Sequence, residues 1–302
     1  MAKLIKSDLQ LTLKHPIFIF GMFLTLAVNL YYIFSDRSGG SIMRVFTPFC
    51  AVFFLPLGMC VLTVFTCGTD LSSRTISRKL SMGYTKKEIY LSHLISSLVA
   101  AFFLTLPCFV SIIIPVYLAK LNFGVFFVYY IYSLLAIFAM TAIIVFLTAL
   151  INIKSVAFVM SFILCSSSIL MFINFGGRVE APEYLITYNT IETPITDEDG
   201  NSYIMQEYIG EQVKVKNPEY ITGMKRRIYS AIAYFSPGCF LYHMSSKNLN
   251  YAELGYDDVR EQFESVFRSN MTGFFKSVPF SLCVFALFSF FGVQLFKKKD
   301  LN

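Results

Sequence analysis

Six long stretches without a charged residue constrain the fold of this chain more than any other feature. A helix rises about 1.5 Å per residue, so a run of this kind is long enough to cross a hydrocarbon core of about 30 Å. Only 15% of the residues are charged, against about a quarter in soluble domains. We therefore predict an all-α polytopic membrane protein with six transmembrane helices. The stretches, each of at least 18 residues, are Ile17–Phe34, Val45–Thr69, Leu94–Ala119, Leu121–Ile153, Ser155–Gly177 and Ser277–Phe296.

Lysine and arginine divide unequally between the two sides of these predicted spans. Twelve lie in the N-terminal segment, the second and fourth connections and the C-terminal tail, whereas the first and third connections hold three. Short connections that are rich in Lys and Arg stay in the cytosol. We therefore expect a multi-pass protein of the plasma membrane with both termini in the cytosol, and residues 277–302 as the sixth span followed by a basic cytosolic tail.

The segment before the first span, residues 1–16, has a modest helical pattern. Lys3, Lys6, Gln10 and Lys14 share one arc at about 100° per residue, and an apolar stripe lies next to it, while Leu4 and Leu11 fall outside that stripe. We predict an amphipathic helix lying in the plane of the inner leaflet. The alternative is a frayed polar terminus. The stripe consists of Ile5, Leu9 and Leu13.

The fifth connection, residues 178–276, has the charge density of soluble protein. It holds fourteen of the nineteen acidic residues. Tyr, Ile, Thr and Val dominate Leu185–Ile195 and Tyr203–Val215, and the sequence between them favours a turn, which predicts a β-hairpin. Ile221–Phe235 and Val259–Phe274 repeat apolar residues at helical spacing. We predict a small extracellular α+β domain between spans five and six, whose apolar stripes pack on the spans or, alternatively, bind a ligand.

The chain lacks the residues that would let it drive transport or catalysis alone. The six uncharged stretches contain no Asp, Glu, Lys or Arg, and intramembrane carboxylates are the usual proton and sodium relays. No GxxxxGK[ST] phosphate loop is present, and no histidine has a second ligand at metal-binding spacing. We therefore expect no catalytic residue, no bound metal and no bound cofactor. Energy for uphill movement would have to come from a partner.

The second connection, Asp70–His93, has the pattern of two short helices in sequence. Ser72 or Ser73 is placed to cap a cationic helix over residues 72–82, and Gly83 suits the left-handed residue that ends a helix. Thr85 and Glu88 have the spacing of a capping box, in which each side chain bonds the other's backbone amide. A basic loop that only enforces topology is the alternative.

This segment resembles a known family. Thr75-Ile76-Ser77-Arg78-Lys79-Leu80, then Gly83-Tyr84, Lys86 and Ile89-Tyr90-Leu91-Ser92, are similar to the segment after the second span in the ABC transporter type-2 permease family. The likeness is nearest to its bacitracin-type and lantibiotic-type exporters and immunity transporters. The resemblance implies a bacterial protein with an amphipathic N-terminal helix, six spans and cytosolic ends, in which this segment is the coupling helix that docks on a separate ATPase subunit.

The resemblance also implies a function. The chain would be the permease subunit of an ATP-binding cassette transporter that exports, or confers resistance to, a peptide, antibiotic or other hydrophobic substrate. ATP and Mg²⁺ would bind the partner ATPase, and the chain would pair with a second copy or a related permease within membrane lipids, without nucleic acid. The alternatives are an ABC-coupled sensor that transports nothing and an intramembrane enzyme. The docking residues would be Arg74, Thr75, Ile76, Arg78, Lys79, Leu80 and Gly83.

Overall fold

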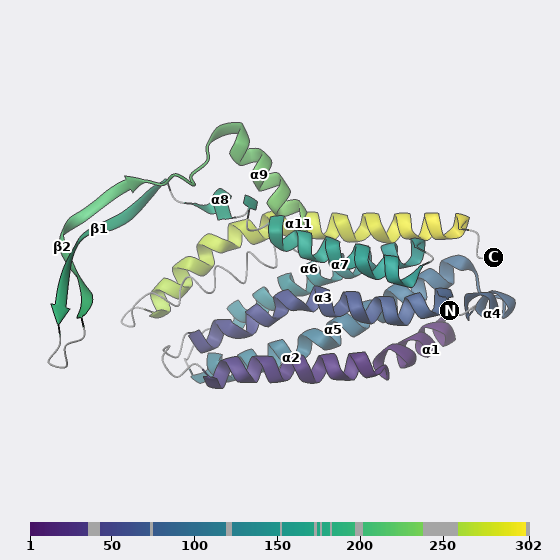
Figure 1. The fold of residues 1–302 in the computed structure, drawn as a ribbon. Coiled ribbons are helices and arrows are strands. Elements are labelled where there is room, and N and C mark those ends of the chain that lie inside the picture. The colour runs from purple at the N-terminus through teal and green to yellow at the C-terminus, as the bar shows by residue number, and fades with distance from the viewer. Residues whose placement is uncertain are drawn as a thin grey trace.

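A computed structural model of the 302-residue chain describes residues 1–35, 43–72, 75–118, 123–151, 153–171, 174–175, 177–181, 183–196, 202–237 and 259–299. The described chain is mostly helical, as predicted, and a bundle of long helices makes up most of it (Figure 1). Both termini and the short helix α4 lie at one end of this bundle, and a β-hairpin extends from the other end (Figure 1).

The N-terminal segment forms helix α1, Ala2–Leu13, which is followed by α2, Pro16–Ser35, at an angle of 57°. The helix is confirmed, but its inward face differs from the predicted apolar stripe. Leu4, Asp8 and Thr12 are buried, whereas Ile5, Leu9 and Leu13 are only half-buried. These three buried residues recur every four positions, so they form one face that packs on the protein, chiefly on α5. Leu4, which lies outside the predicted apolar stripe, belongs to this buried face.

Five further long helices cover most of the other uncharged stretches. They are α3 (Met43–Ser72), α5 (Lys86–Leu118), α6 (Phe123–Leu150), α7 (Lys154–Met171) and α11 (Val259–Lys298). By length and composition, three described helical segments can span a membrane: Lys86–Ser111, Tyr130–Leu150 and Val278–Lys298. The number rises to five if two bent pairs, α1 with α2 and α3 with α4, each count as one span. The apolar segment Lys154–Ser168 of α7 is shorter than these spans.

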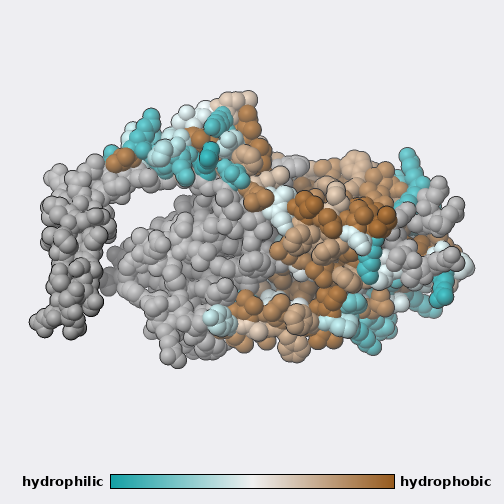
Figure 2. Space-filling view, viewed as in Figure 1, coloured by the Kyte–Doolittle hydropathy of each residue, from teal (hydrophilic) through white to brown (hydrophobic). Residues whose placement is uncertain are grey.

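The centre of the bundle is an apolar cluster built around α6. Ala136, Ile137, Met140 and Ile144 of this helix are buried against residues of α3 and α5. Large apolar side chains such as Phe23, Ile163 and Phe290 are exposed on the outside. On the face that Figure 2 shows, apolar side chains cover the coloured part of the bundle, and hydrophilic side chains lie at the end that carries the termini and over α9. An apolar face of this kind matches the surface that lipid tails would cover.

Helix α11 packs closely on α5 through a glycine. The Tyr90 hydroxyl of α5 donates to the Phe288 carbonyl at 3.4 Å, and its ring lies 5.9 Å from that of Phe296. A Cβ atom at Gly292 would overlap the Tyr90 hydroxyl, so only glycine leaves room for the tyrosine there. These contacts fix the rotation of α11 against α5.

The fifth connection contains the predicted hairpin. Strand β1, Tyr184–Thr196, pairs antiparallel with β2, Ser202–Lys216, from Tyr184↔Lys216 to Thr196↔Ser202, with an irregularity between Tyr188 and Thr190. The predicted turn at 197–201 lies outside the described residues. Helix α8, Gly177–Glu180, precedes the hairpin, and the predicted helix near Ile221–Phe235 is confirmed as α9, Gly223–Phe235.

Helix α11 continues across the predicted boundary between the fifth connection and the sixth span, at residues 276 and 277. It runs without a break over 40 residues, from Val259 to Lys298, with Pro279 inside it. At about 1.5 Å per residue its length is about 60 Å, roughly twice the thickness of a hydrocarbon core. The last apolar stretch and the helical end of the fifth connection therefore form one continuous helix.

Candidate functional site

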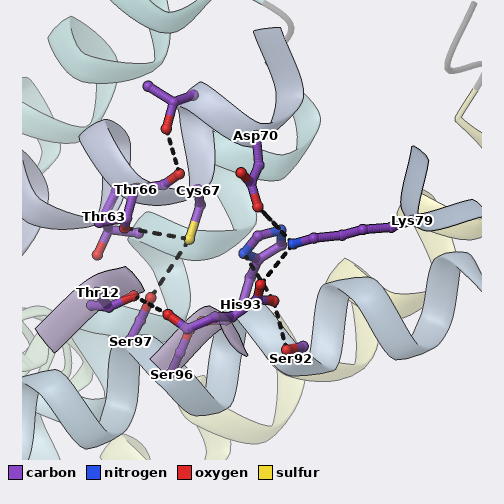
Figure 3. Close-up of polar contacts among 12 residues, drawn as sticks. Thr12, Thr63, Thr66, Cys67, Asp70, Lys79, Ser92, His93, Ser96 and Ser97 are labelled. Carbon is purple, nitrogen blue, oxygen red and sulfur yellow. Dashed lines mark hydrogen bonds and ion pairs between the residues drawn. The ribbon is translucent and has the colours of Figure 1, made fainter. Parts of the chain in front are cut away.

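A buried polar cluster lies where α1, α3, α4 and α5 meet, at the end of the bundle that carries the termini (Figure 3). Helix α4 is the short helix Thr75–Ser81 in the second connection. We call the group the Lys79 cluster, and each of the four helices contributes to it. Its members are Asp8 of α1, Asp70 of α3, Lys79 of α4, and Ser92 and His93 of α5.

The Lys79 ammonium group is the centre of this cluster. Its Nζ atom lies 2.7 Å from Asp8 Oδ1 and 2.6 Å from Asp70 Oδ2. All three side chains are nearly inaccessible to solvent. Charge-assisted hydrogen bonds of this length are among the strongest in proteins. Helix α4 is therefore tied by one side chain to both α1 and α3.

The second carboxylate oxygen of Asp8 connects the cluster to α5. Ser92 Oγ donates to Asp8 Oδ2 at 2.7 Å. The His93 ring lies between the two carboxylates, with Nδ1 3.9 Å from Asp8 Oδ2 and Nε2 3.6 Å from Asp70 Oδ2. These distances suit an ion pair if the imidazole is protonated, and they are too long for good hydrogen bonds. The cluster thus links all four helices.

The electrostatics of the cluster favour a charged Lys79. Burial alone lowers the pKa of Lys79, but its hydrogen bonds to Asp70 and Asp8 and their negative charges outweigh that effect, so the pKa lies above its usual value. Two carboxylates face one ammonium group, so losing the ammonium would leave two buried negative charges close together. Such a loss is strongly destabilising.

A second set of contacts joins α3 and α5 one turn deeper in the bundle. Cys67 Sγ lies 3.7 Å from Ser97 Oγ and 3.8 Å from Thr66 Oγ1 (Figure 3). Thr66 Oγ1 also donates to the Leu62 carbonyl of its own helix at 2.9 Å. These weaker bonds extend the polar contacts between α3 and α5 beyond the Lys79 cluster.

Helix α4 presents two different faces. Ile76, Lys79 and Leu80 are three or four positions apart, so they share the inward face. Ile76 is buried, and Leu80 packs against the apolar cluster that Ile76 forms with Leu4 and Ile89. Ser77, Arg78 and Ser81 are exposed on the outward face. An ion pair and an apolar contact thus fix α4 from the inside, and its cationic outer face stays accessible.

The end of α4 and the start of α5 have the predicted local geometry. Gly83 has φ of +90°, the left-handed conformation, and the Tyr84 amide donates to the Lys79 carbonyl at 3.2 Å. The Thr85 amide donates to Glu88 Oε2 at 2.9 Å, and the Glu88 amide donates to Thr85 Oγ1 at 3.2 Å. The capping box is therefore confirmed, and α5 begins at Lys86, directly after Thr85.

The predicted docking residues differ in how far the structure exposes them to solvent. Thr75 begins α4, Arg78 is exposed, and Leu80 is half-buried, whereas Ile76 and Lys79 point into the protein. Arg74 lies outside the described residues. The predicted helix 72–82 is shorter than expected, because α3 continues to Ser72 and α4 begins only at Thr75. Ser72 therefore belongs to the preceding helix and does not cap α4.

Sequence reasoning missed the other members of the cluster. Asp8 belongs to neither the apolar stripe nor the basic arc of the first helix, and the local pattern around His93 does not indicate its partners. A usable signal was the scarcity of acidic residues, because only five of the nineteen lie outside residues 178–276. Two of those five, Asp8 and Asp70, converge on Lys79.

The described part of the chain contains no group of three or more His, Cys, Asp or Glu side chains arranged to hold a metal ion. In the cluster itself, the Lys79 ammonium occupies the position between the two carboxylates that a cation would need. Comparison with protein-family models and with curated protein sequences finds no match to this chain. The function therefore has to be argued from the geometry of the cluster.

Proposed function

We propose that this chain is the membrane subunit of an ATP-driven transporter and that a separate ATPase subunit acts on it through α4. In this proposal the six apolar stretches cross the plasma membrane, both termini and α4 face the cytosol, and the hairpin and α9 lie outside. The substrate class is hydrophobic, a peptide or antibiotic in keeping with the family resemblance. Two copies, or this chain with a related permease, would form the pathway.

One observation supports the proposal above the others. Lys79 fixes α4 to α1 and α3 with two buried charged hydrogen bonds, and Ser92 extends the link to α5. A short surface helix that only enforced topology would need no such attachment. Because an isolated carboxylate is costly to bury, α4 cannot tilt away without exposing Asp8 and Asp70 or moving their helices with it. A force applied to α4 would therefore reach three helices at once.

The outward face of α4 has the composition of a docking surface. Arg78 is exposed beside Ser77 and Ser81, and Met82 directly after the helix is 73% exposed. Arginine and methionine are enriched in protein interfaces, where a guanidinium group pairs with carboxylates of the partner. The partner implied by this face is an ATPase subunit with an acidic rim around an apolar groove.

Reconstitution of the chain with its ATPase into liposomes tests the function. ATP-dependent movement of a hydrophobic peptide across the bilayer is the expected result, and a chain with Lys79→Met, whose α4 is detached, should lose it. The sensor alternative predicts ATP hydrolysis that depends on the membrane chain but moves no substrate. Hydrolysis of ATP by the isolated chain would contradict both forms of the proposal.

A further inference from the structure

A pocket of about 350 Å³ lies at the far end of α7, close to α8 and α9. The start of α7 is next to α3, where Lys154 Cγ approaches Gly68, four residues before the end of α3. The other end of α7, at Met171, is therefore on the side of the bundle opposite α4. The pocket does not belong to the Lys79 cluster, and the proposed function does not use it.

The two walls of this pocket differ in chemistry. Arg178 of α8 and Asn174 form a polar wall, and Leu170 and Met171 of α7 form an apolar one. Arg178 is exposed, and it is the one charged residue among the described residues that line the pocket. The ion pairs found in the described part of the chain all lie at the opposite end of the bundle. A guanidinium group with five donors is thus available to an anion.

The polar wall is held in place by contacts between the small helices. Arg226 of α9 donates to the Val179 carbonyl at 3.0 Å and to the Tyr220 hydroxyl at 3.2 Å, which fixes the residue next to Arg178. The Phe175 and Tyr229 rings, both part of the lining, pack edge to face with centroids 4.8 Å apart. Asn174 Nδ2 donates to the Leu170 carbonyl at 2.8 Å, and the same amide group has a second N–H.

The apolar wall continues along the outer face of α7. Val159, Ile163 and Leu170 are 50%, 56% and 58% exposed, and their spacing puts them on one side of the helix. This exposed apolar side runs along α7 from Val159 to Leu170, which lines the pocket. A ligand that combined an anionic head with a hydrocarbon tail would match both the guanidinium group and this surface.

We propose that this pocket binds the phosphate-bearing headgroup of an anionic amphiphile, with its hydrocarbon tail lying along the exposed side of α7. Arg178 pairs with the phosphate, Asn174 adds a hydrogen-bond donor, and Leu170 and Met171 contact the upper part of the tail. The assignment is independent of the ATP-driven function, because it requires only that α7 lies in the bilayer.

A unique fluorophore tests this assignment. The chain contains no tryptophan, so Met171→Trp, in the pocket wall, reports on its surroundings without background. In nanodiscs, phosphatidylglycerol with brominated tails should quench this tryptophan at about tenfold lower content than brominated phosphatidylcholine, as expected when a charged hydrogen bond is gained. Arg178→Gln should remove the preference and Arg178→Lys should retain most of it. Arg227→Gln, an exposed cation of α9 outside the lining, is the matched control and should change nothing.

Three results would overturn the assignment. Equal quenching by the two lipids in the Arg178 protein would show no anion selectivity. A preference that survives Arg178→Gln would show that another group selects the headgroup. Loss of the preference with inorganic phosphate or glycerol phosphate at no higher concentration than the lipid would show that the pocket recognises the free anion and that the tail contributes nothing. Retention of the preference in Arg178→Lys separates the loss of a charge in Arg178→Gln from simple unfolding of α8.

Discussion

Lys79 Nζ and Asp8 Oδ1 lie 2.7 Å apart, although 71 positions separate the two residues in the chain. This contact joins the first helix of the protein to the short helix between α3 and α5. A second bond from Lys79 to Asp70 Oδ2, at 2.6 Å, fixes the end of α3 in the same place. The position of α4 is therefore set by buried charges.

Replacement of Lys79 by methionine should strongly destabilise the protein. The substitution leaves the Asp8 and Asp70 carboxylates buried without their cation, which costs about 3–5 kcal/mol of unfolding free energy. Thermal unfolding in detergent measures the effect. Lys87→Met is the matched control, because Lys87 is an exposed cation near the start of α5 and should change stability by less than about 0.5 kcal/mol. Equal melting temperatures for the two variants would contradict the buried ion pairs.

Substitution of Gly292 by alanine should loosen α11 from α5. The added Cβ overlaps the Tyr90 hydroxyl, and overpacking of this kind costs about 1–3 kcal/mol. Tyr90→Phe in the same chain removes the hydroxyl and should restore part of the loss, which unfolding of the single and double variants would measure. Gly58→Ala in α3 is the control, because no atom outside the nearby backbone of its own helix lies within 4 Å of the new Cβ, and it should be neutral or stabilising by up to about 1 kcal/mol. A neutral Gly292→Ala would show that the two helices do not pack in this register.

Loss of the capping box should weaken the start of α5. Thr85→Ala removes the acceptor of the Glu88 amide and should cost about 1 kcal/mol, whereas Thr85→Ser keeps the hydroxyl and most of the stability. Hydrogen exchange of the amides in the first turn of α5 provides a local readout. The cap would be refuted if the alanine and serine variants exchanged at the same rate.

Single cysteines at Met82 and Met224 test the orientation of the chain in the membrane. The two methionines are 73% and 71% exposed, so differences in labelling report sidedness and not burial. A membrane-impermeant thiol reagent should label Met224→Cys in intact cells and Met82→Cys only after the membrane is opened, with the parent chain as background for its natural cysteines. Labelling of Met82→Cys in intact cells would place α4 outside the cell and contradict the proposal that a cytosolic ATPase binds it.

The local features of the fold could be predicted from the sequence because their causes are local. Long uncharged runs predicted the helices, Gly83 and the Thr85–Glu88 pair predicted the junction before α5, and β-rich segments predicted the hairpin. Helical spacing predicted the first part of α11, Val259–Phe274, but the boundary between residues 276 and 277 was placed inside the helix, because the charge pattern changes there while the helix continues.

The candidate site could be predicted only in part, because its central contacts are far apart in sequence. Periodicity in a seven-residue helix groups Ile76, Lys79 and Leu80 on one face but does not say whether that face points inward or outward. The hypothesis that all the cations of α4 face a partner therefore assigned Lys79 to the surface. Its burial depends on Asp8, whose place beside α4 follows from the packing of α1 on α5.

The most direct test of the central claim is whether the outward face of α4 holds the ATPase. Arg78→Glu reverses the exposed charge on that face without touching the Lys79 cluster, and Lys3→Glu reverses an exposed charge on α1 as the matched control. The measurement is the ATP hydrolysis that co-purifies with each tagged chain from native membranes. The account predicts that Lys3→Glu retains this activity and that Arg78→Glu loses most of it while remaining inserted. Undiminished activity with Arg78→Glu would contradict the account.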